Sequence, residues 1–139
     1  VEVVLPQDVI NAREFSADAP SNVVDALEIP DGWRIMDIGP EATKSFIAEL
    51  EECKTVLWNG PMGAFETEPF DTATVALAKT AAALTQDGSL TSVAGGGDTV
   101  AALAHAGVKD EFTFVSTAGG AFLEWMEGKP LPGVDALKA

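Results

Sequence analysis

The stretch SLTSVAGGGDTVAALAH, residues 89–105, joins an apolar run to three consecutive glycines and then to an Ala-rich segment. The apolar run over residues 89–94 predicts a β-strand, and residues 99–105 predict a helix that Gly107 ends. Glycine adopts positive φ and lets the backbone approach a neighbouring group closely. A strand that passes through a glycine loop into a helix is typical of α/β proteins with a parallel sheet.

The same order of strand, loop and helix recurs along the chain. Its pattern predicts further strands over residues 1–5, 34–38, 55–58 and 112–116, and helices over residues 41–53, 70–84 and 122–127. Residues 7–30 are polar and contain breaking prolines, so we expect them to be irregular. The alternation predicts an α/β fold with a doubly wound, mostly parallel sheet of the Rossmann-like, three-layer type.

Composition limits the classes of partner. The net charge is -14, from 22 acids against 8 bases. Such a surface repels polyanions, so we expect neither nucleic-acid binding nor attachment to an anionic membrane. No apolar run approaches the roughly 18 residues of a membrane span. The single cysteine, Cys53, cannot form an internal disulfide, which fits a reducing compartment.

The beginning of the chain has a pattern of its own. Val1–Leu5 is a short, mainly apolar run rich in β-branched residues, with no initiator Met, helix cap or turn before it. We therefore expect a strand that is already under way, in a chain that is a fragment of a longer protein.

Three predicted strands end in loops that contain glycine: Asn59–Gly63, Gly95–Thr99 and Ala118–Gly120. In a parallel sheet the carboxyl ends of the strands lie at one edge, where ligands bind. The amides of Gly95–Thr99 could form an anion-binding nest at a helix N-terminus. A carboxylate beside an anion needs a cation, so Asp98 suggests a bridging Mg²⁺. The alternative is that Asp98 only caps the helix and the glycines only make a tight turn.

The other two loops also allow two interpretations each. The amides of Ala118–Gly120 could stabilise a phosphoryl group, or the glycines could serve close packing of a helix on a strand. Glu66 could bind paired hydroxyls such as those of a ribose, or it could be an ordinary exposed acid.

His105, the only histidine, is explained by its place near a helix C-terminus. None of the three loops contains Lys or Arg, and none has the P-loop or dinucleotide spacing.

Four segments, in this order along the chain, resemble the phosphoglycerate kinase family: MDIGPEA (36–42), LWNGPMGAFE (57–66), GGGDTVAAL (95–103) and STAGGAFLEWMEGKPLPGV (116–134). VVLPQDVINA (3–12) resembles it too. The resemblance implies reversible phosphoryl transfer between 1,3-bisphosphoglycerate and ADP, giving 3-phosphoglycerate and MgATP, in glycolysis, gluconeogenesis or carbon fixation.

The resemblance also implies a domain organisation. The family has two Rossmann-like domains, of which the N-terminal one binds phosphoglycerate and the C-terminal one binds nucleotide, and their closure completes the site. We expect residues 1–139 to be part of the C-terminal domain, with residues 130–139 as its tail and the N-terminal domain absent. We also expect the full enzyme to be a cytoplasmic monomer.

Site residues follow from the matched segments. The resemblance implies that Asp98 binds the metal and that the nucleotide is held by Asn59, Glu66, Gly96, Gly97, Asp98 and Thr99. Glu66 would hold the ribose hydroxyls, and the others would face the phosphates. Gly97, Gly119 and Gly120 would face the transferred group. Two positions depart from the family: Ala118 stands where many members have a third glycine, and Ile35 stands where many have a glycine near the adenine.

We expect the chain to be inactive alone, because the family's basic phosphoglycerate pocket and its nucleotide-binding lysine would lie upstream. Two alternatives remain open from the sequence. One is a non-catalytic nucleotide-binding module that keeps the phosphate loops. The other is a structural remnant that binds no ligand.

Overall fold

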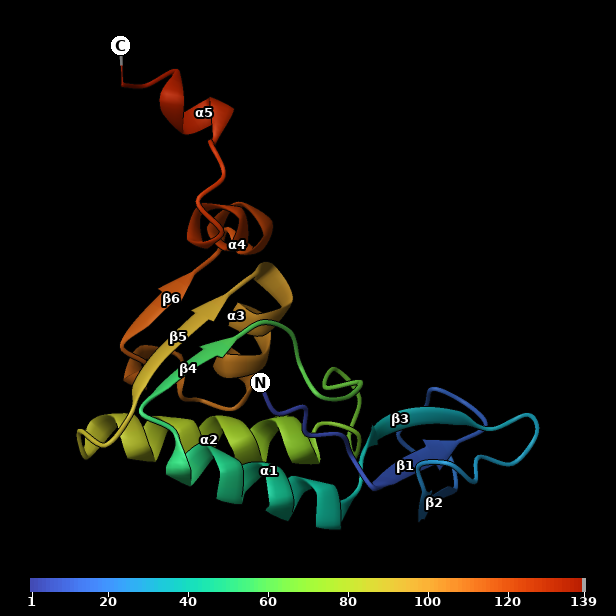
Figure 1. The fold of residues 1–139 in the computed structure, drawn as a ribbon. Coiled ribbons are helices and arrows are strands. Elements are labelled where there is room, and N and C mark those ends of the chain that lie inside the picture. The colour runs from blue at the N-terminus through green and yellow to red at the C-terminus, as the bar shows by residue number, and fades with distance from the viewer. Residues whose placement is uncertain (139) are drawn as a thin grey trace.

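The computed structural model describes residues 1–138 and contains two three-stranded sheets with helices packed against them (Figure 1). The strands are β1 (Asp8–Ala12), β2 (Ser21–Asp25), β3 (Arg34–Ile38), β4 (Thr55–Trp58), β5 (Thr91–Gly95) and β6 (Phe114–Ser116). The helices are α1 (Pro40–Glu52), α2 (Thr72–Gln86), α3 (Gly97–His105), a 3-10 turn η1 (Lys109–Glu111), α4 (Gly119–Met126) and α5 (Pro132–Asp135).

The parallel sheet has the order β4-β5-β6, and each strand is followed by a helix. Trp58 pairs with Ala94, and Gly95 pairs with Ser116, so the three strands end at the same edge. The α/β class and the parallel pairing that the alternation predicts are therefore confirmed. Trp58 and Ala94 belong to the main core, which they share with buried residues of α2 and α3.

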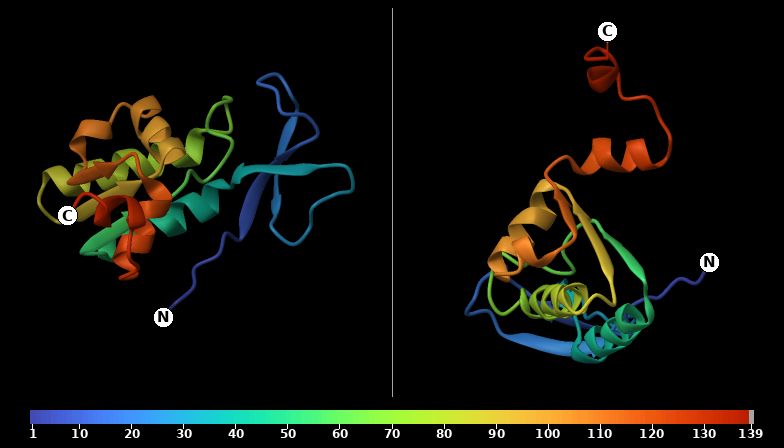
Figure 2. Two further views of the ribbon diagram at one scale, coloured as in Figure 1. Left: turned by 90° about the horizontal axis from the view of Figure 1, so that it is seen from above. Right: turned by 90° about the vertical axis from the view of Figure 1, so that its left-hand side faces the viewer.

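The opposite face of the parallel sheet is more open. Leu57, Val93 and Phe114 are paired in register, and Leu57 and Phe114 are exposed. β4 has the predicted bounds, but it lies at the edge of its sheet and only its Trp58 is buried. α5 extends away from both sheets (Figure 2), whereas α4 contacts the end of the parallel sheet through Phe122, whose ring centre lies 6.3 Å from that of Phe114 in β6; neither helix has a buried residue.

The second sheet was not predicted. It is antiparallel, with the order β2-β1-β3, and it shows that the expectation of irregular structure over residues 7–30 was wrong. β3 has the predicted bounds, but it pairs antiparallel with β1 and does not join the parallel sheet. The sheet buries Ala12 and Met36 against Phe70. This packing stabilises β1 and β3, whereas β2 has no buried residue and is held by its antiparallel pairing with β1.

The strand expected over Val1–Leu5 was also wrong. These residues lie outside both sheets, and the side chains of Val1, Val3 and Leu5 are exposed. An apolar run becomes a strand only when its backbone finds a partner, and none of the described strands pairs with this one.

Element ends differ only slightly from those expected. α2 begins at Thr72, two residues later than predicted, and α4 begins at Gly119, three residues earlier than predicted, so that it includes Gly119 and Gly120. The tail expected over residues 130–139 contains the short helix α5, while residue 139 lies outside the described part. Within residues 1–138, no helix has the length and apolar character needed to cross a membrane.

Carboxylates from strands cap the first two helices. Asp8 of β1 accepts hydrogen bonds from the amides of Glu41 (3.1 Å) and Ala42 (2.7 Å) in the first turn of α1. A Cβ on Gly39, the residue before α1, would lie 2.2 Å from the Asp8 carboxyl carbon, so only glycine fits there. The caps satisfy amides that a helix cannot pair internally.

Asp37 of β3 does the same for α2, accepting from the Ala73 amide at 3.1 Å. Here too a glycine makes room, because a Cβ on Gly63 would lie 2.4 Å from an Asp37 oxygen. These two contacts connect the antiparallel sheet to helices that pack under the parallel sheet.

Candidate functional site

The loops after β5 and β6 are packed backbone against backbone. A Cβ on Gly119 would lie 2.7 Å from the Cα of Gly96, closer than real side chains approach, and 3.1 Å from the Gly96 nitrogen. Gly96 itself has φ of 102°, a conformation that favours glycine. Its amide donates to the Ser116 carbonyl at 3.0 Å. Both positions therefore require glycine, and the amide of Gly96 is already paired within the protein.

The loop after β4 contacts the loop after β5, which carries Gly96, and the first turn of α3, which carries Thr99. The Gly60 amide donates to the hydroxyl of Thr99 at 2.7 Å, and Thr99 is 1% exposed. A Cβ on Gly96 would lie 3.5 Å from the Asn59 side-chain oxygen, so Asn59 lies beside the glycine loop. The structure thus brings together five of the predicted positions: Asn59, Gly96, Gly97, Thr99 and Gly119.

The N-terminus of α3 is open to solvent. Gly97 and Asp98 are exposed, and among residues 1–138 no side chain accepts a hydrogen bond from the first amides of this helix. Space around Gly97 is also free, since a Cβ there would meet nothing within 4 Å. Unpaired amides and the helix dipole make such an end attractive to an anion.

The N-terminus of α4 lies next to it, because Gly119 contacts Gly96. Ala118 is the residue before this helix, and its exposed side chain makes no cap. Its amide donates to the Ser116 hydroxyl at 3.2 Å. Gly120 has free space around it. Two uncapped helix starts therefore converge at one edge of the parallel sheet.

A model of the phosphoglycerate kinase family matches residues 1–129. The chain belongs to the phosphoglycerate kinase family. Its phosphoglycerate kinase relatives include that of Sphingopyxis alaskensis, 67% identical over 135 residues, which are 97% of this chain and 34% of the relative. That of Rhizorhabdus wittichii is 63% identical over 137 residues, 99% of this chain and 34% of the relative.

Solved phosphoglycerate kinases share the fold. The structure from Coxiella burnetii has a TM-score of 0.84 at 42% identity and covers 94% of this chain and 33% of its own. That from Pyrococcus horikoshii has a TM-score of 0.76 at 31% identity, with 96% and 32% covered. The chain thus spans about a third of the length of the phosphoglycerate kinases it matches.

Glu66, the ribose residue implied by the phosphoglycerate kinase resemblance, lies apart from the glycine loops. It is exposed on the connection between β4 and α2. Its neighbour Phe65 packs edge-on against His105, at 6.3 Å between ring centres. Gly97 begins α3 and His105 ends it. The connection between β4 and α2 therefore starts at the glycine loops and reaches the opposite end of this nine-residue helix, which is about 13 Å long.

His105 and Ile35 also lie away from the converging loops. The His105 ring bonds to the Asp71 carboxylate, which precedes α2, at 2.8 Å. This agrees with a structural role at the helix end. Ile35 is exposed on β3 in the antiparallel sheet.

Asp37 is the buried acid that sequence reasoning missed. Burial raises the pKa of its carboxyl from an ordinary value of 3.8 to about 6, although amide bonds from Ala73 and Ile38 oppose the rise and nearby Asp71 adds to it. The side chain is 1% exposed. Because it caps α2, its contacts account for the burial without a ligand.

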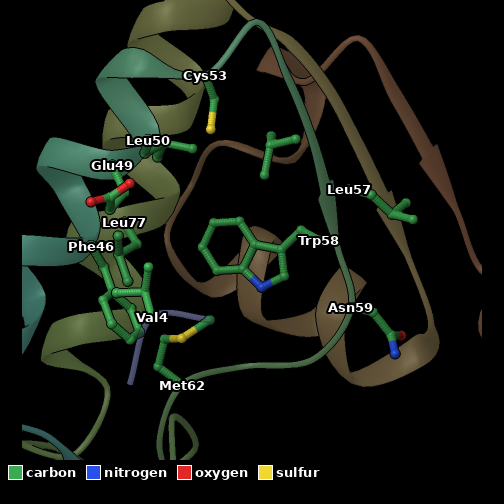
Figure 3. Close-up of a pocket in the computed structure, with 11 residues that line it drawn as sticks. Val4, Phe46, Glu49, Leu50, Cys53, Leu57, Trp58, Asn59, Met62 and Leu77 are labelled. Atoms are coloured by element: carbon green, nitrogen blue, oxygen red, sulfur yellow. The ribbon is translucent and has the colours of Figure 1, made fainter. Parts of the chain in front are cut away.

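An apolar cavity of about 370 Å³ lies between α1 and β4 (Figure 3). Trp58 points into it, toward Leu50 and Met62, whereas Asn59 points to the other side of the chain. Glu49 is the only charged residue of its lining. Phosphate requires donors or positive charge, so this cavity does not fit a phosphate, and the open helix starts do.

Within residues 1–138 no three acidic, histidine or cysteine side chains cluster as a metal site. Asp98 is therefore a single exposed carboxylate. Mg²⁺ commonly takes one or two carboxylates and completes its shell with water and substrate phosphates. The residues present fit an ion that arrives with a nucleotide, and they do not form a resident metal centre.

Proposed function

We propose that this chain provides the nucleotide-binding part of a kinase that reversibly transfers a phosphoryl group between 1,3-bisphosphoglycerate and ADP, giving 3-phosphoglycerate and ATP. Family membership supports the reaction class. The observation that supports the site is the open N-terminus of α3 beside that of α4, held together by the contact of Gly96 with Gly119. A nucleotide phosphate fits there because the amides are unpaired.

Each residue then has a defined part in the proposal. The amides of Gly97, Asp98 and Thr99 bind phosphate oxygens, and those of Gly119 and Gly120 face the transferred group. The Asp98 carboxylate holds Mg²⁺, which would neutralise phosphate charge when bound. Gly96 contributes its shape, since its own amide is paired with Ser116.

Asn59 lies close enough to Gly96 to contact a phosphate at the same edge. Glu66 holds the ribose, at the other end of α3. The nucleotide would therefore lie along this helix, with its phosphates at Gly97 and its sugar near Phe65 and His105.

Phosphoryl transfer needs more than this chain. The three loops contain no Lys or Arg, although the transferred group requires positive charge. In our proposal residues 1–139 belong to a C-terminal nucleotide domain, and the basic phosphoglycerate site belongs to an N-terminal domain. The whole enzyme is then a cytoplasmic monomer that serves glycolysis, gluconeogenesis or carbon fixation, and this chain alone makes no ATP.

Calorimetric titration of the 139-residue chain with MgADP tests the site. We expect saturable binding that weakens by about tenfold, or 1.4 kcal/mol, when Asp98 is replaced by Asn or Mg²⁺ is chelated. Asp110→Asn is the matched control, because it removes one exposed acid from η1 and should leave affinity unchanged. Absence of binding at millimolar MgADP would contradict the proposal and favour a structural role.

A further inference from the structure

The side chain of Thr74 places a hydroxyl group among buried apolar residues. It lies in the first turn of α2 and is 0% exposed, between the buried residues Ala73 and Leu77. Valine has almost the same shape and no polar atom to bury. The hydroxyl has one contact that valine could not make, since it accepts a hydrogen bond from the Met62 amide at 3.1 Å. Met62 belongs to the loop that follows β4.

That loop, Asn59–Gly63, is held from three directions. At its start the Gly60 amide bonds to Thr99 of α3, and the Gly60 carbonyl accepts from the Trp58 indole at 2.5 Å. At its end Gly63 packs so closely on Asp37 that no Cβ fits between them. Thr74 provides the contact in the middle, and it comes from a different helix from the one whose N-terminus is open.

The position of Asn59 depends on these contacts. Its side chain is exposed, and among residues 1–138 no hydrogen bond holds that side chain. It stays beside Gly96 only because the backbone around it is fixed. Loss of the Met62 bond would leave a part-buried amide unpaired, and the loop would move to satisfy it.

We propose that Thr74 is a positioning residue, whose buried hydroxyl fixes the Asn59–Gly63 loop against the N-terminus of α3 and so sets the nucleotide affinity of the site. Its link to affinity rests on the proposed function, whereas its link to the loop does not. Thr74 touches no ligand in this arrangement. It acts through Met62 and Gly60, which connect α2 to the edge of the sheet.

The experiment compares three variants of the chain. Thr74→Val removes the hydroxyl at constant shape, and Thr74→Ser restores it. Thr80→Val is the control, because within the described residues 1–138 the Thr80 hydroxyl bonds only to the Ala76 carbonyl of its own helix. Amide hydrogen exchange by NMR reports the loop, and calorimetry reports MgADP affinity.

In Thr74→Val we expect the Met62 and Gly60 amides to exchange about two- to tenfold faster and MgADP to bind weaker by a similar factor. Amides of β5 should keep their exchange rates, Thr74→Ser should approach the wild type, and Thr80→Val should match it. Unchanged exchange at Met62 and Gly60 would overturn the proposal. So would a uniform increase across the chain, because that signals lost stability and not a local anchor.

The two proposals fail differently. If the wild type binds no MgADP, the nucleotide function is wrong, and the exchange rates still decide whether Thr74 fixes the loop. If the wild type binds MgADP, and Thr74→Val loosens the loop without weakening binding, Thr74 is not a positioning residue for nucleotide.

Discussion

The four long helices of this chain begin in two different ways. The first amides of α1 and α2 are occupied by carboxylates from the antiparallel sheet, Asp8 and Asp37. The helices α3 and α4 follow strands of the parallel sheet, and glycines without a capping side chain stand at their starts. A capped helix start contributes to stability, and an open one leaves its amides for a ligand. α2 also follows a strand of the parallel sheet, so the difference lies in whether a carboxylate of the antiparallel sheet reaches the helix start.

Glycine serves both kinds of start. At Gly39 and Gly63 the missing Cβ makes room for a carboxylate, which closes the helix end. At Gly96 and Gly119 it allows two backbones to touch, which leaves the ends of α3 and α4 side by side and open. A glycine before a helix is therefore not by itself a sign of a phosphate site. A carboxylate beside the glycine closes the helix end, whereas a neighbouring backbone leaves the helix end open to a ligand.

The largest expected effect comes from Gly119→Ala at the open starts. The new Cβ would lie 2.7 Å from the Cα of Gly96, so the two loops must separate. We expect a loss of about 1–3 kcal/mol in the free energy of unfolding, from overpacking. Because the clash falls on the loops of the proposed site, MgADP affinity should fall by about tenfold or more. Urea unfolding and calorimetry measure the two quantities.

Gly133→Ala provides the control, since a Cβ there meets nothing within 4 Å and α5 lies outside the site. Its affinity and stability should match those of the wild type. If Gly119→Ala kept the MgADP affinity of the wild type, close packing of these loops would not be needed for binding. The open helix starts would then not form the nucleotide site that we propose.

The sequence reveals the open helix starts better than the capped ones. The reason is the sequence separation between the residues that make each contact. The strand–glycine–helix order is local, so β5, its glycines and α3 could be predicted, and parallel pairing then brings Asn59, Gly96 and Gly119 to one edge. The caps are not local. Asp8 lies 34 residues before Ala42, and Asp37 lies 36 before Ala73.

The antiparallel sheet escaped prediction for a related reason. The β1 sequence DVINA contains Asp8 and Asn11, and β2 has only two apolar residues, so neither shows clear alternation. Tertiary contact with Phe70, far along the chain, stabilises β1, and β2 is held by its backbone pairing with β1. Likewise, nothing in the glycine triplet itself indicates that the Gly96 amide is paired with Ser116 while that of Gly97 is exposed.

An effect on stability alone, with no loss of nucleotide affinity, should appear at a capped start as pH changes. The pKa of Asp37 is raised to about 6 in the folded chain from an ordinary value of 3.8, so the folded state holds this proton more tightly than the unfolded state. The stabilisation from this group is therefore full below about pH 4 and is lost as pH rises through about 6. The corresponding change in the free energy of unfolding is up to about 3 kcal/mol.

Urea unfolding at several values between pH 4 and pH 7 measures this change. The stability of the wild type relative to Asp37→Asn should decline as pH rises, because only the wild type carries the titrating carboxyl. Asp18→Asn, which removes an exposed acid, controls for the general effect of net charge. A difference between wild type and Asp37→Asn that stays constant with pH would show that the α2 cap does not titrate in this range.

The smallest expected effect converts an open start into a capped one. Ala118 precedes α4 and is exposed, so Ala118→Asp can place a carboxylate over the first amides of that helix, as Asp8 does for α1. An N-cap acid should add about 0.5–1 kcal/mol to the free energy of unfolding. The same negative charge should weaken MgADP binding about two- to fivefold, because it competes with phosphate for those amides.

Ala118→Asn separates the effect of capping from the effect of charge, since the Asn side chain also caps the helix but carries no charge. This variant should raise stability with a smaller loss of affinity. If Asp and Asn weakened binding equally, obstruction of the helix end would explain the result, and charge competition at α4 would not.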